Sequence, residues 1–317
     1  MLKLVLRGIR ANLGRLVLTL ISVVLGVAFV SGSFVLADSL RSIFNQISET
    51  AFAGVDAQVR AIEPELNSSG ENLIRFDDSL VAVVADLPEV EYAEGGLFAF
   101  EQTYSILDDG EVNRPLGPPV FTASWGGPSP VSSFTVIEGT APQGQQVVLN
   151  KSQVESGEFA VGDDIVMSLP SGEPEVFELS AIVEFGEGGA AGAYFNLFDL
   201  PTTQRILDAA GEIDSIVVNA AAGSSPEELL TAIQPLLPSD IEVVSGETVI
   251  GESQDDFGDF ITIFGNILLG FAIVVLFVST FIIYNTFAIL VGQRTKQLGL
   301  LRSIGASGPQ IRAMVLV

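Results

Sequence analysis

Pairs of adjacent aspartates are the residues of this sequence best suited to chemistry. Neighbouring carboxylates can act as a general acid and base or can hold a cation, provided that the fold sets the right distance between them. The chain has 39 acidic residues, and none of the pairs has the spacing of a calcium loop. We interpret the pairs as solvated acidic surface, with a catalytic or cation site as the weaker alternative. They are Asp77-Asp78, Asp108-Asp109, Asp163-Asp164 and Asp255-Asp256.

The sequence lacks the residues that other common kinds of catalysis require. The chain contains no histidine and no cysteine, which removes the usual triad base, the commonest zinc ligands and disulfides. A glycine cluster resembles a phosphate-binding loop, but no Lys-Ser or Lys-Thr follows and the spacing is wrong. We interpret this cluster as a flexible hinge; it comprises Gly186, Gly188, Gly189 and Gly192. The chain is therefore predicted not to be an enzyme, with no catalytic, metal-binding or cofactor-binding residue.

Charge is segregated along the chain. The 317 residues have a net charge of −25 and yet a mean hydropathy of +0.49. All 39 acidic residues lie between Asp38 and Asp259 with six of the 14 basic ones, whereas both flanks hold basic residues alone. Such an acidic region would repel phosphates, which argues against nucleic-acid binding. The basic flanks fit the rule that positive loops stay in the cytoplasm.

Two apolar runs separate the acidic region from the basic flanks. Leu16–Leu36 is apolar apart from small Ser, Thr and Gly residues, and Phe260–Val291 has no charged side chain. Because about 20 apolar residues cross the hydrocarbon layer, both runs are predicted to be transmembrane helices. A cleaved signal peptide ending at Ala37 is the less favoured alternative for the first run, since its apolar core is too long. We expect a multi-pass protein of the plasma membrane, with a cytoplasmic N-terminus and a large extracytoplasmic domain.

The predicted segments follow from these boundaries. They are a basic amphipathic lead-in at 1–15, a first span at 16–37, an extracytoplasmic domain at 38–259, a second span at 260–291, a cytoplasmic helix at 292–306 and the start of a third membrane helix at 307–317. Strand-like runs within about 140–186 predict a small β subdomain inserted into an α+β lobe. The fold class is thus an α+β membrane protein, with two transmembrane helices flanking a large extracytoplasmic α+β domain.

Helix ends in the extracytoplasmic domain carry local signals. Four helices are predicted: Ser39–Ala53, one capped by Asp77 or Asp78 and stopped by Pro88, one opened by Asp199 and closed by Gly211, and one begun by the capping box of Ser225 and Glu228. The segment Pro115–Pro130, rich in proline and glycine around Trp125, is predicted to be an irregular loop. It is either a surface feature or a contact site.

The tail after the second span is basic and amphipathic. Three apolar residues recur at three-residue intervals, and two cations remain available for water or an acidic partner; these are Leu298, Leu301 and Ile304, and Lys296 and Arg302. Gly305 suits the end of this helix, and Ser307 with Gln310 forms a second capping box. The helix either lies on anionic lipid or docks on a cytoplasmic protein.

Four polar positions lie within the second span: Asn266, Thr280, Asn285 and Thr286. Such groups usually hydrogen-bond to neighbouring membrane helices. We assign Asn266 to the outer interface and Asn285 to a helix contact.

A family resemblance rests on both membrane flanks. The tail reads RTKQLGLLRSIGAS from Arg294 to Ser307, preceded by Ile283-Tyr284-Asn285-Thr286-Phe287. It is similar to the pattern R-x-x-E-I-G-L-L-R-A-I-G-A-S of FtsX/MacB-like permeases of ABC transporters. The first span also fits that family at Leu18-Thr19-Leu20 and Leu25-Gly26-Val27-Ala28. One departure is Gln297, which stands where the family has a glutamate.

The resemblance implies a permease subunit that couples ATP hydrolysis to export or to mechanical work outside the membrane. It implies a separate or fused cytoplasmic ABC-type ATP-binding subunit, which holds the ATP, and a dimer of permease halves. It also implies further spans beyond Val317, so that the chain is truncated, and a possible extracytoplasmic partner or substrate. The coupling helix would contact the ATPase through Arg294, Lys296, Gln297, Leu298, Leu301, Arg302, Ile304 and Gly305. Packing between membrane helices is expected at Gly26, Asn285 and Thr286.

Two alternatives from other functional classes remain. A membrane-anchored sensor would bind an extracellular ligand and would carry a signalling domain after Val317. An extracytoplasmic hydrolase would need a concave pocket that holds two carboxylates, and it ranks last.

Overall fold

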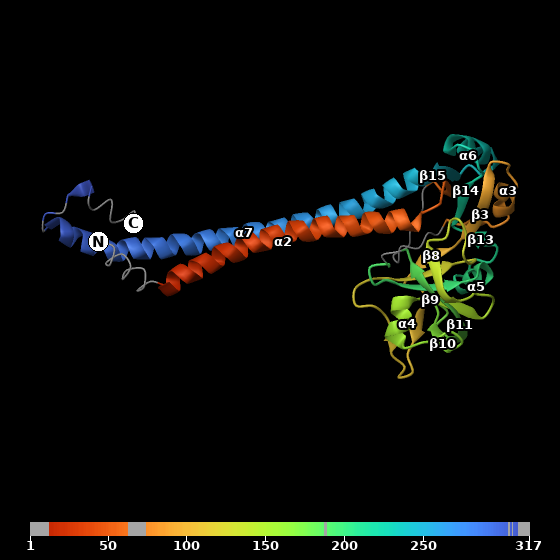
Figure 1. Cartoon of the computed structure of the whole chain (residues 1–317), viewed down its shortest axis with the longest axis horizontal. Helices are drawn as coiled ribbons and strands as arrows, with labels where there is room; N and C mark the ends of the chain where they lie inside the picture. The colour runs from red at the N-terminus through yellow and green to blue at the C-terminus, as the bar shows by residue number, and fades with distance from the viewer. Residues whose placement is uncertain (1–12, 63–73, 187–188, 304, 306, 310–317) are drawn as a thin grey trace. The chain divides into compact units, whose positions relative to one another are not determined.

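The computed structural model describes residues 13–62, 74–186, 189–303, 305 and 307–309. These residues form two compact units (Figure 1). The first unit holds the described residues up to Ser42 and from Phe257 onward, and the second is Ile43–Asp256. Two long helices build the first unit, whereas the second is a domain of mixed helices and strands. The predicted fold class, two apolar helices flanking a large α+β domain, is confirmed.

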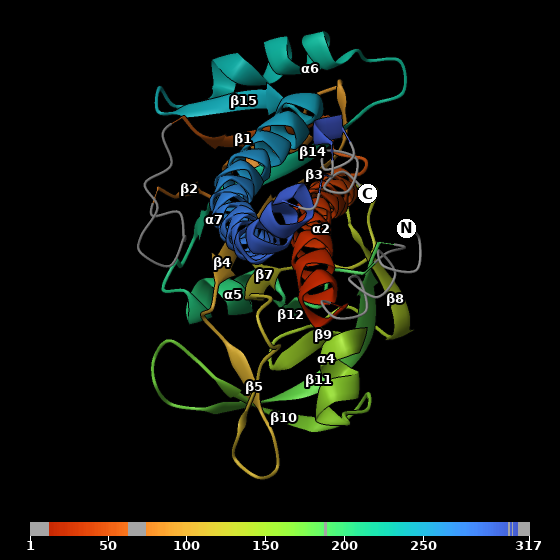
Figure 2. The same cartoon turned by 90° about the vertical axis from the view of Figure 1, so that its left-hand side faces the viewer.

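Helices α2 (Leu13–Ala51) and α7 (Gly246–Ser303) are both long and apolar enough to cross a membrane. In the first unit they lie side by side and run in opposite directions (Figures 1 and 2). Many of their large apolar side chains are exposed, among them Leu20 at 64% and Phe277 at 71%. Helices that expose so much apolar surface require lipid or further helices around them, because exposing an apolar patch of this size to water is unfavourable.

Helix α7 joins three segments that the sequence predicted as separate parts. The acidic segment before the second span, the span itself and the predicted cytoplasmic helix are one helix, which begins at Gly246 and ends at Ser303. This stretch contains no proline, so nothing in the backbone forces a break. The end agrees with the prediction: Gly305 has φ +99°, and its N–H donates to the carbonyl oxygen of Arg302 at 3.2 Å.

A four-stranded antiparallel sheet forms the first lobe of the second unit. Its elements follow the order strand, helix, strand, strand, helix, strand, and the strands lie in the order β15-β1-β14-β3, which is the ferredoxin-like arrangement. Helices α3 and α6 pack on this sheet, because Val84 of α3 and Leu229 and Ile233 of α6 belong to the same apolar core as its strands. The bounds are β1 Ala57–Ala61, α3 Leu80–Ala85, β3 Val90–Gly96, β14 Ser215–Ala220, α6 Pro226–Ile233, the 3₁₀ turn Gln234–Leu236 and β15 Ile241–Ser245. A two-stranded sheet pairs β2 (Phe76–Asp77) with β13 (Glu212–Ile213).

A nine-stranded mixed sheet, inserted between β3 and β14, forms the second lobe. Its main path is β4-β7-β12-β9-β11-β10-β5-β6, and β8 pairs with β11. The predicted subdomain at 140–186 contains only β9, β10 and β11, so the insertion is present but larger than expected. Its elements are β4 Phe98–Phe100, β5 Tyr104–Ile106, β6 Val112–Asn113, β7 Val120–Ser124, β8 Phe134–Gly139, β9 Gln146–Asn150, α4 Lys151–Gly157, β10 Asp164–Ser168, β11 Glu175–Phe185, β12 Tyr194–Phe198 and α5 Leu200–Ile206.

Most of the local helix signals act as predicted. Ser225 and Glu228 form the full capping box of α6, and the Asp199 carboxylate accepts the N–H of Thr202 at the start of α5. Two predictions about helix ends were wrong. The N-cap of α3 is Ser79, since Asp77 accepts the N–H of Ser79 in a preceding turn, and α5 ends at Ile206 rather than at Gly211.

The predicted irregular loop Pro115–Pro130 contains the ordered strand β7, which runs parallel to β12. Trp125, which directly follows this strand, is 5% exposed and packs with Phe134 and Phe195 in an apolar cluster. Its indole N–H donates to the Ser132 hydroxyl at 3.0 Å. Trp125 is thus a core residue of the inserted lobe, and not a surface contact.

A buried polar network joins the strands of the inserted lobe to α4. The Asn196 amide donates to the backbone carbonyl of Thr103 and lies 2.9 Å from its hydroxyl, and its oxygen accepts from Gln153 at 2.8 Å. Gln153 also donates to Ser105, and the hydroxyls of Thr103 and Thr122 lie 2.9 Å apart. All five side chains are fully buried. The network therefore fixes the pairing of strands that lie far apart in the sequence.

We expect Asn196→Ala to destabilise the domain by about 3 kcal/mol, because it leaves several buried polar groups without partners. Trp125 is the only tryptophan of the chain, so its fluorescence during denaturant unfolding of the full chain in detergent reports on this lobe. Gln145→Ala removes an exposed side chain and should change stability by less than about 0.5 kcal/mol. Equal effects of the two substitutions would contradict the structural role of the network.

Candidate functional site: the helix pair and its attachments

The end of α2 is attached to the inserted lobe. Ile47 and Ala51 pack against the apolar cluster that contains Trp125 and Phe134. On the same helix, Thr50 lies against Gly186, where an added Cβ would stand 2.4 Å from the Thr50 methyl group. Side-chain packing against the nine-stranded lobe therefore holds the last turns of α2.

The start of α7 is attached to the four-stranded lobe. Gly246 directly follows β15, and its N–H donates to the carbonyl oxygen of Asp56 at 2.9 Å. An added Cβ at Gly246 would stand only 1.9 Å from the carbonyl oxygen of Val55, so only glycine fits here. On β1, Arg60 forms ion pairs with Glu242 of β15 and with Glu252 of α7. The Glu252 carboxylate, and after it Glu242, raise the pKa of Arg60 despite its partial burial.

A hydrogen bond joins the two helix ends directly. The hydroxyls of Ser48 in α2 and Ser253 in α7 lie 2.9 Å apart, and Ser48 is only 1% exposed. Within the second unit, the end of α2 and the start of α7 are therefore bonded to each other, although different lobes hold them.

Glu94 of β3 ties the two lobes together. Its carboxylate accepts the N–H of Gly126 at 3.0 Å and the hydroxyls of Tyr92 at 3.1 Å and Ser129 at 3.3 Å. Burial, followed by the Glu94 charge, raises the pKa of Tyr92, which keeps the phenol a proton donor. Gly126 and Ser129 follow β7 of the inserted lobe, so these bonds cross from one sheet to the other. A cavity of about 460 Å³ lies beside them.

In the first unit, small residues bring α2 and α7 close together. Gly26 is buried, and a Cβ added there would stand 3.7 Å from the Ser279 hydroxyl and 3.8 Å from Val275. Ser279 and Ala272 of α7 are themselves buried, at 7% and 3% exposure. Such small residues let membrane helices approach closely. Asn285 and Thr286, the other expected packing positions, are half-buried, and Asn266 is exposed.

The predicted ATPase-contacting segment is the last part of α7. Arg294, Lys296, Gln297, Leu298, Leu301 and Arg302 all have helical backbone. Ile304 and the capping residue Gln310 lie outside the described residues. Arg302 is exposed, and Leu300, which the predicted apolar stripe omitted, is 68% exposed. The helix thus ends in a segment that presents both a cation and an apolar side chain.

The aspartate pairs form no active site in the described residues. Seven of the eight carboxylates are exposed, and Asp78, the half-buried one, accepts a hydrogen bond from Gln204. Asp109 and Asp163 accept backbone N–H groups within turns. No group of three or more metal-binding side chains occurs in the part of the chain that the structure describes.

Two helices that are apolar and long enough to cross a membrane, together with a two-lobed domain between them in the sequence, suit a membrane protein. The family model of the MacB-like periplasmic core domain matches residues 16–236, more than half of the chain, and that of the FtsX-like permease C-terminal domain matches residues 269–317. The chain therefore belongs to the MacB/FtsX-like family of ABC-transporter permeases. Such permeases are transmembrane components that are generally not catalytic and that work with a cytoplasmic ATP-binding subunit.

Solved structures give more distant likenesses. The periplasmic region of MacB from Actinobacillus actinomycetemcomitans has a TM-score of 0.44 and 10% identity over 63% of this chain and 93% of that one. The extracellular domain of the noncanonic ABC-type transporter YknZ from Gram-positive bacteria has a TM-score of 0.41 and 11% identity, over 60% and 100%. No curated protein matches the sequence. We base the family assignment on the two family models alone.

The attachment of α7 is tested by two identical substitutions in one helix. Gly246→Ala should destabilise the domain by about 1–3 kcal/mol, because its Cβ overlaps the carbonyl of Val55. Gly251→Ala should instead stabilise it by up to about 1 kcal/mol, since nothing lies within 4 Å of the added Cβ and alanine favours the helix. Trp125 fluorescence during unfolding of the full chain measures both. The same sign for both variants would refute a tight contact at Gly246.

The packing of the helix pair is tested by cross-linking. The chain has no cysteine, so the double variant Gly26→Cys, Ser279→Cys should form an intramolecular disulfide when membranes are mildly oxidised. The matched pair Gly32→Cys, Ser279→Cys should not, because nothing lies within 4 Å of a Cβ at position 32. Mobility on non-reducing gels shows which pair forms. Cross-linking of the second pair alone would contradict the observed packing.

Proposed function

We propose that this chain is the permease subunit of an ABC transporter in which a cytoplasmic ATPase drives export or mechanical work outside the membrane. The observation that supports this most strongly is the unbroken course of α7. One helix begins against Val55 in the domain, includes the second apolar run and ends in the segment that resembles a coupling helix. An unbroken helix can transmit a displacement along its axis.

The proposed mechanism is mechanical. Closure of the ATPase on ATP moves the coupling segment, which comprises residues 292–306. Helix α7 carries this movement to its attachment at Gly246 and Arg60, while packing at Ile47 and Ala51 holds α2 on the other lobe. A displacement of α7 relative to α2 then changes the angle between the lobes. The substrate or partner on the extracytoplasmic side would respond to that change.

The charge distribution supports the proposed topology. The basic flanks favour a cytoplasmic location for the N-terminus and for the end of α7, and an extracytoplasmic location for the acidic domain. The chain would then cross the membrane at least twice and would act as one half of a permease dimer. ATP would bind to the partner subunit, and this chain would hold no cofactor itself.

Reversing the charge of the coupling segment tests the proposal. Arg302 is exposed, and Arg302→Glu should reduce co-purification of the ATPase about tenfold, as expected when a cation facing an acidic partner is replaced by an acid. Quantitative mass spectrometry of the purified complex gives the ratio of ATPase to permease.

Arg302→Lys is the matched control, because it keeps the charge and should retain most of the association. Normal ATPase recovery with Arg302→Glu would show that Arg302 is not part of the contact. Loss with both variants would indicate that guanidinium geometry, and not charge, determines binding.

A further inference from the structure

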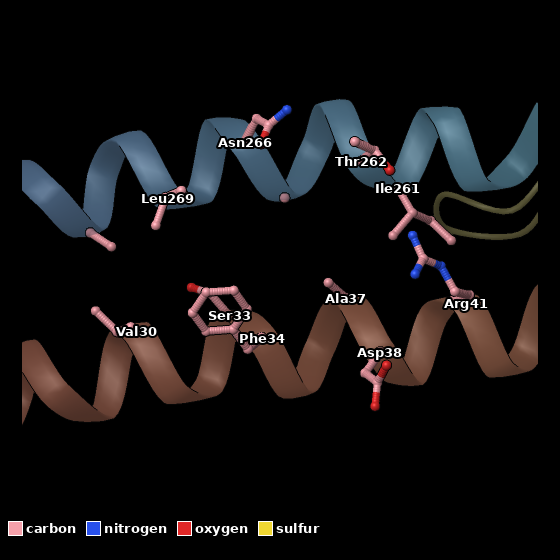
Figure 3. A pocket seen from close by; sticks show the side chains of 12 residues that line it. Val30, Ser33, Phe34, Ala37, Asp38, Arg41, Ile261, Thr262, Asn266 and Leu269 are labelled. Atoms are coloured by element: carbon pink, nitrogen blue, oxygen red, sulfur yellow. The ribbon is translucent and has the colours of Figure 1, made fainter.

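The helix pair of the first unit lines an open cavity of about 270 Å³ that the proposed coupling mechanism does not use. It lies between α2 and α7 (Figure 3). Its apolar wall includes Val30 and Phe34 of α2 and Leu269 and Ala272 of α7, and its polar wall includes Arg41 and Thr262. An added Cβ at Gly265, which also lines the cavity, would meet nothing within 4 Å. The missing side chain at that position helps to keep the space open.

Charged residues line only one end of the cavity. On α2 the lining runs from Val30, Ser33 and Phe34 to Asp38 and Arg41, and on the antiparallel α7 it runs from Ala272 and Leu269 through Asn266 to Thr262 and Ile261. Both charged lining residues therefore lie on the last turns of α2 before the second unit begins, and the rest of the lining is uncharged. Arg41 stands four residues beyond the predicted span, or roughly 6 Å, which is the level of lipid phosphates.

Arg41 is available to bind an anion. Figure 3 shows its guanidinium reaching from α2 toward α7 near Ile261, whereas Asp38, one turn earlier, points away from α7. In the described part of the chain, Arg60 and Arg205 form ion pairs, but the guanidinium of Arg41 has no ion pair or hydrogen bond. A guanidinium presents paired donors that match a phosphate. Its charge is thus unmatched at the polar end of an apolar cavity.

We propose that this cavity binds a glycerophospholipid of the outer leaflet, with the phosphate on Arg41 and the upper part of an acyl chain against Phe34 and Leu269. This inference rests on the proposed function only for the orientation of the helices. The lipid is zwitterionic, because the acidic domain repels a net negative head group. The lipid fills the space between α2 and α7 that small lining residues such as Gly265 leave open.

Other occupants match the cavity less well. Inorganic phosphate would satisfy Arg41 but would leave the apolar wall without contacts. A helix from a second copy would cover the apolar wall and leave Arg41 desolvated without an anion, which is costly. A phospholipid satisfies both ends at once.

The test uses the full chain in lipid nanodiscs made of phosphatidylcholine with a small fraction of photoactivatable phosphatidylethanolamine. Wild-type protein should be labelled on peptides containing residues 30–41 and 261–272. Arg41→Gln should lower labelling of these peptides about tenfold, the effect of one charge-assisted hydrogen bond. Gly265→Leu should lower it as well by filling the cavity. Excess inorganic phosphate should not compete.

Two matched controls separate the site from general effects. Arg205→Gln makes the same charge change on the domain, and Gly270→Leu makes the same size change on α7 at a position that does not line the cavity. Both should be labelled like wild type. Labelling unchanged in Arg41→Gln and Gly265→Leu, or competition by phosphate, would overturn the proposal.

A photo-crosslinking amino acid in place of Phe34 distinguishes a bound lipid from a helix of a second copy of the chain. Cross-links to phosphatidylethanolamine support the lipid, and cross-links to a second copy of the chain overturn it. Neither outcome depends on the ATPase. A failed lipid site with normal effects of Arg302→Glu would therefore leave the proposed function intact, and the reverse result would reject the coupling contact alone.

Discussion

Everything in this structure depends on how two long helices are held where they meet the folded domain. Helix α7 starts so close to the Val55 carbonyl that only glycine fits at position 246, and α2 ends against an aromatic cluster of the other lobe. A buried hydrogen bond between Ser48 and Ser253 joins them. Because the backbone carbonyl of Val55 cannot move aside as a flexible side chain would, α7 has little freedom to slide. This constraint fixes the start of α7 against the four-stranded lobe.

Elements with local signals could be predicted from the sequence, and those that depend on distant pairing could not. The capping box of Ser225 and the Asp199 cap need only neighbouring residues, and both were predicted. The extent of the nine-stranded sheet was not, because β7 lies in a segment whose prolines and glycines suggest a loop. Its order comes from parallel pairing with β12 more than 70 residues later. Trp125 was misjudged for the same reason.

The residues of the candidate site also divide into those with a local signal and those that depend on a distant partner. The motif from Arg294 to Ser307 identified the family without any structure, since its residues are consecutive. The attachments at Ser48 and Arg60 were missed, because each depends on a partner roughly 200 residues away and a lone serine or arginine carries no signal of its own. Gly246 offered a weak signal, as a glycine between a strand and a helix. Leu300 was missed because the apolar stripe was read at intervals of three residues.

The insertion point of the second lobe has a consequence for how such proteins diversify. Gly96, the last residue of β3, and Ser215, the first of β14, are paired in register, so the inserted lobe enters and leaves the four-stranded sheet at neighbouring positions. Insertions whose ends are adjacent leave the host fold unchanged. The inserted lobe can thus be enlarged or exchanged without altering the strand order of the four-stranded sheet, from which α7 emerges. The size and surface of the inserted lobe can therefore vary while the four-stranded sheet keeps its strand order.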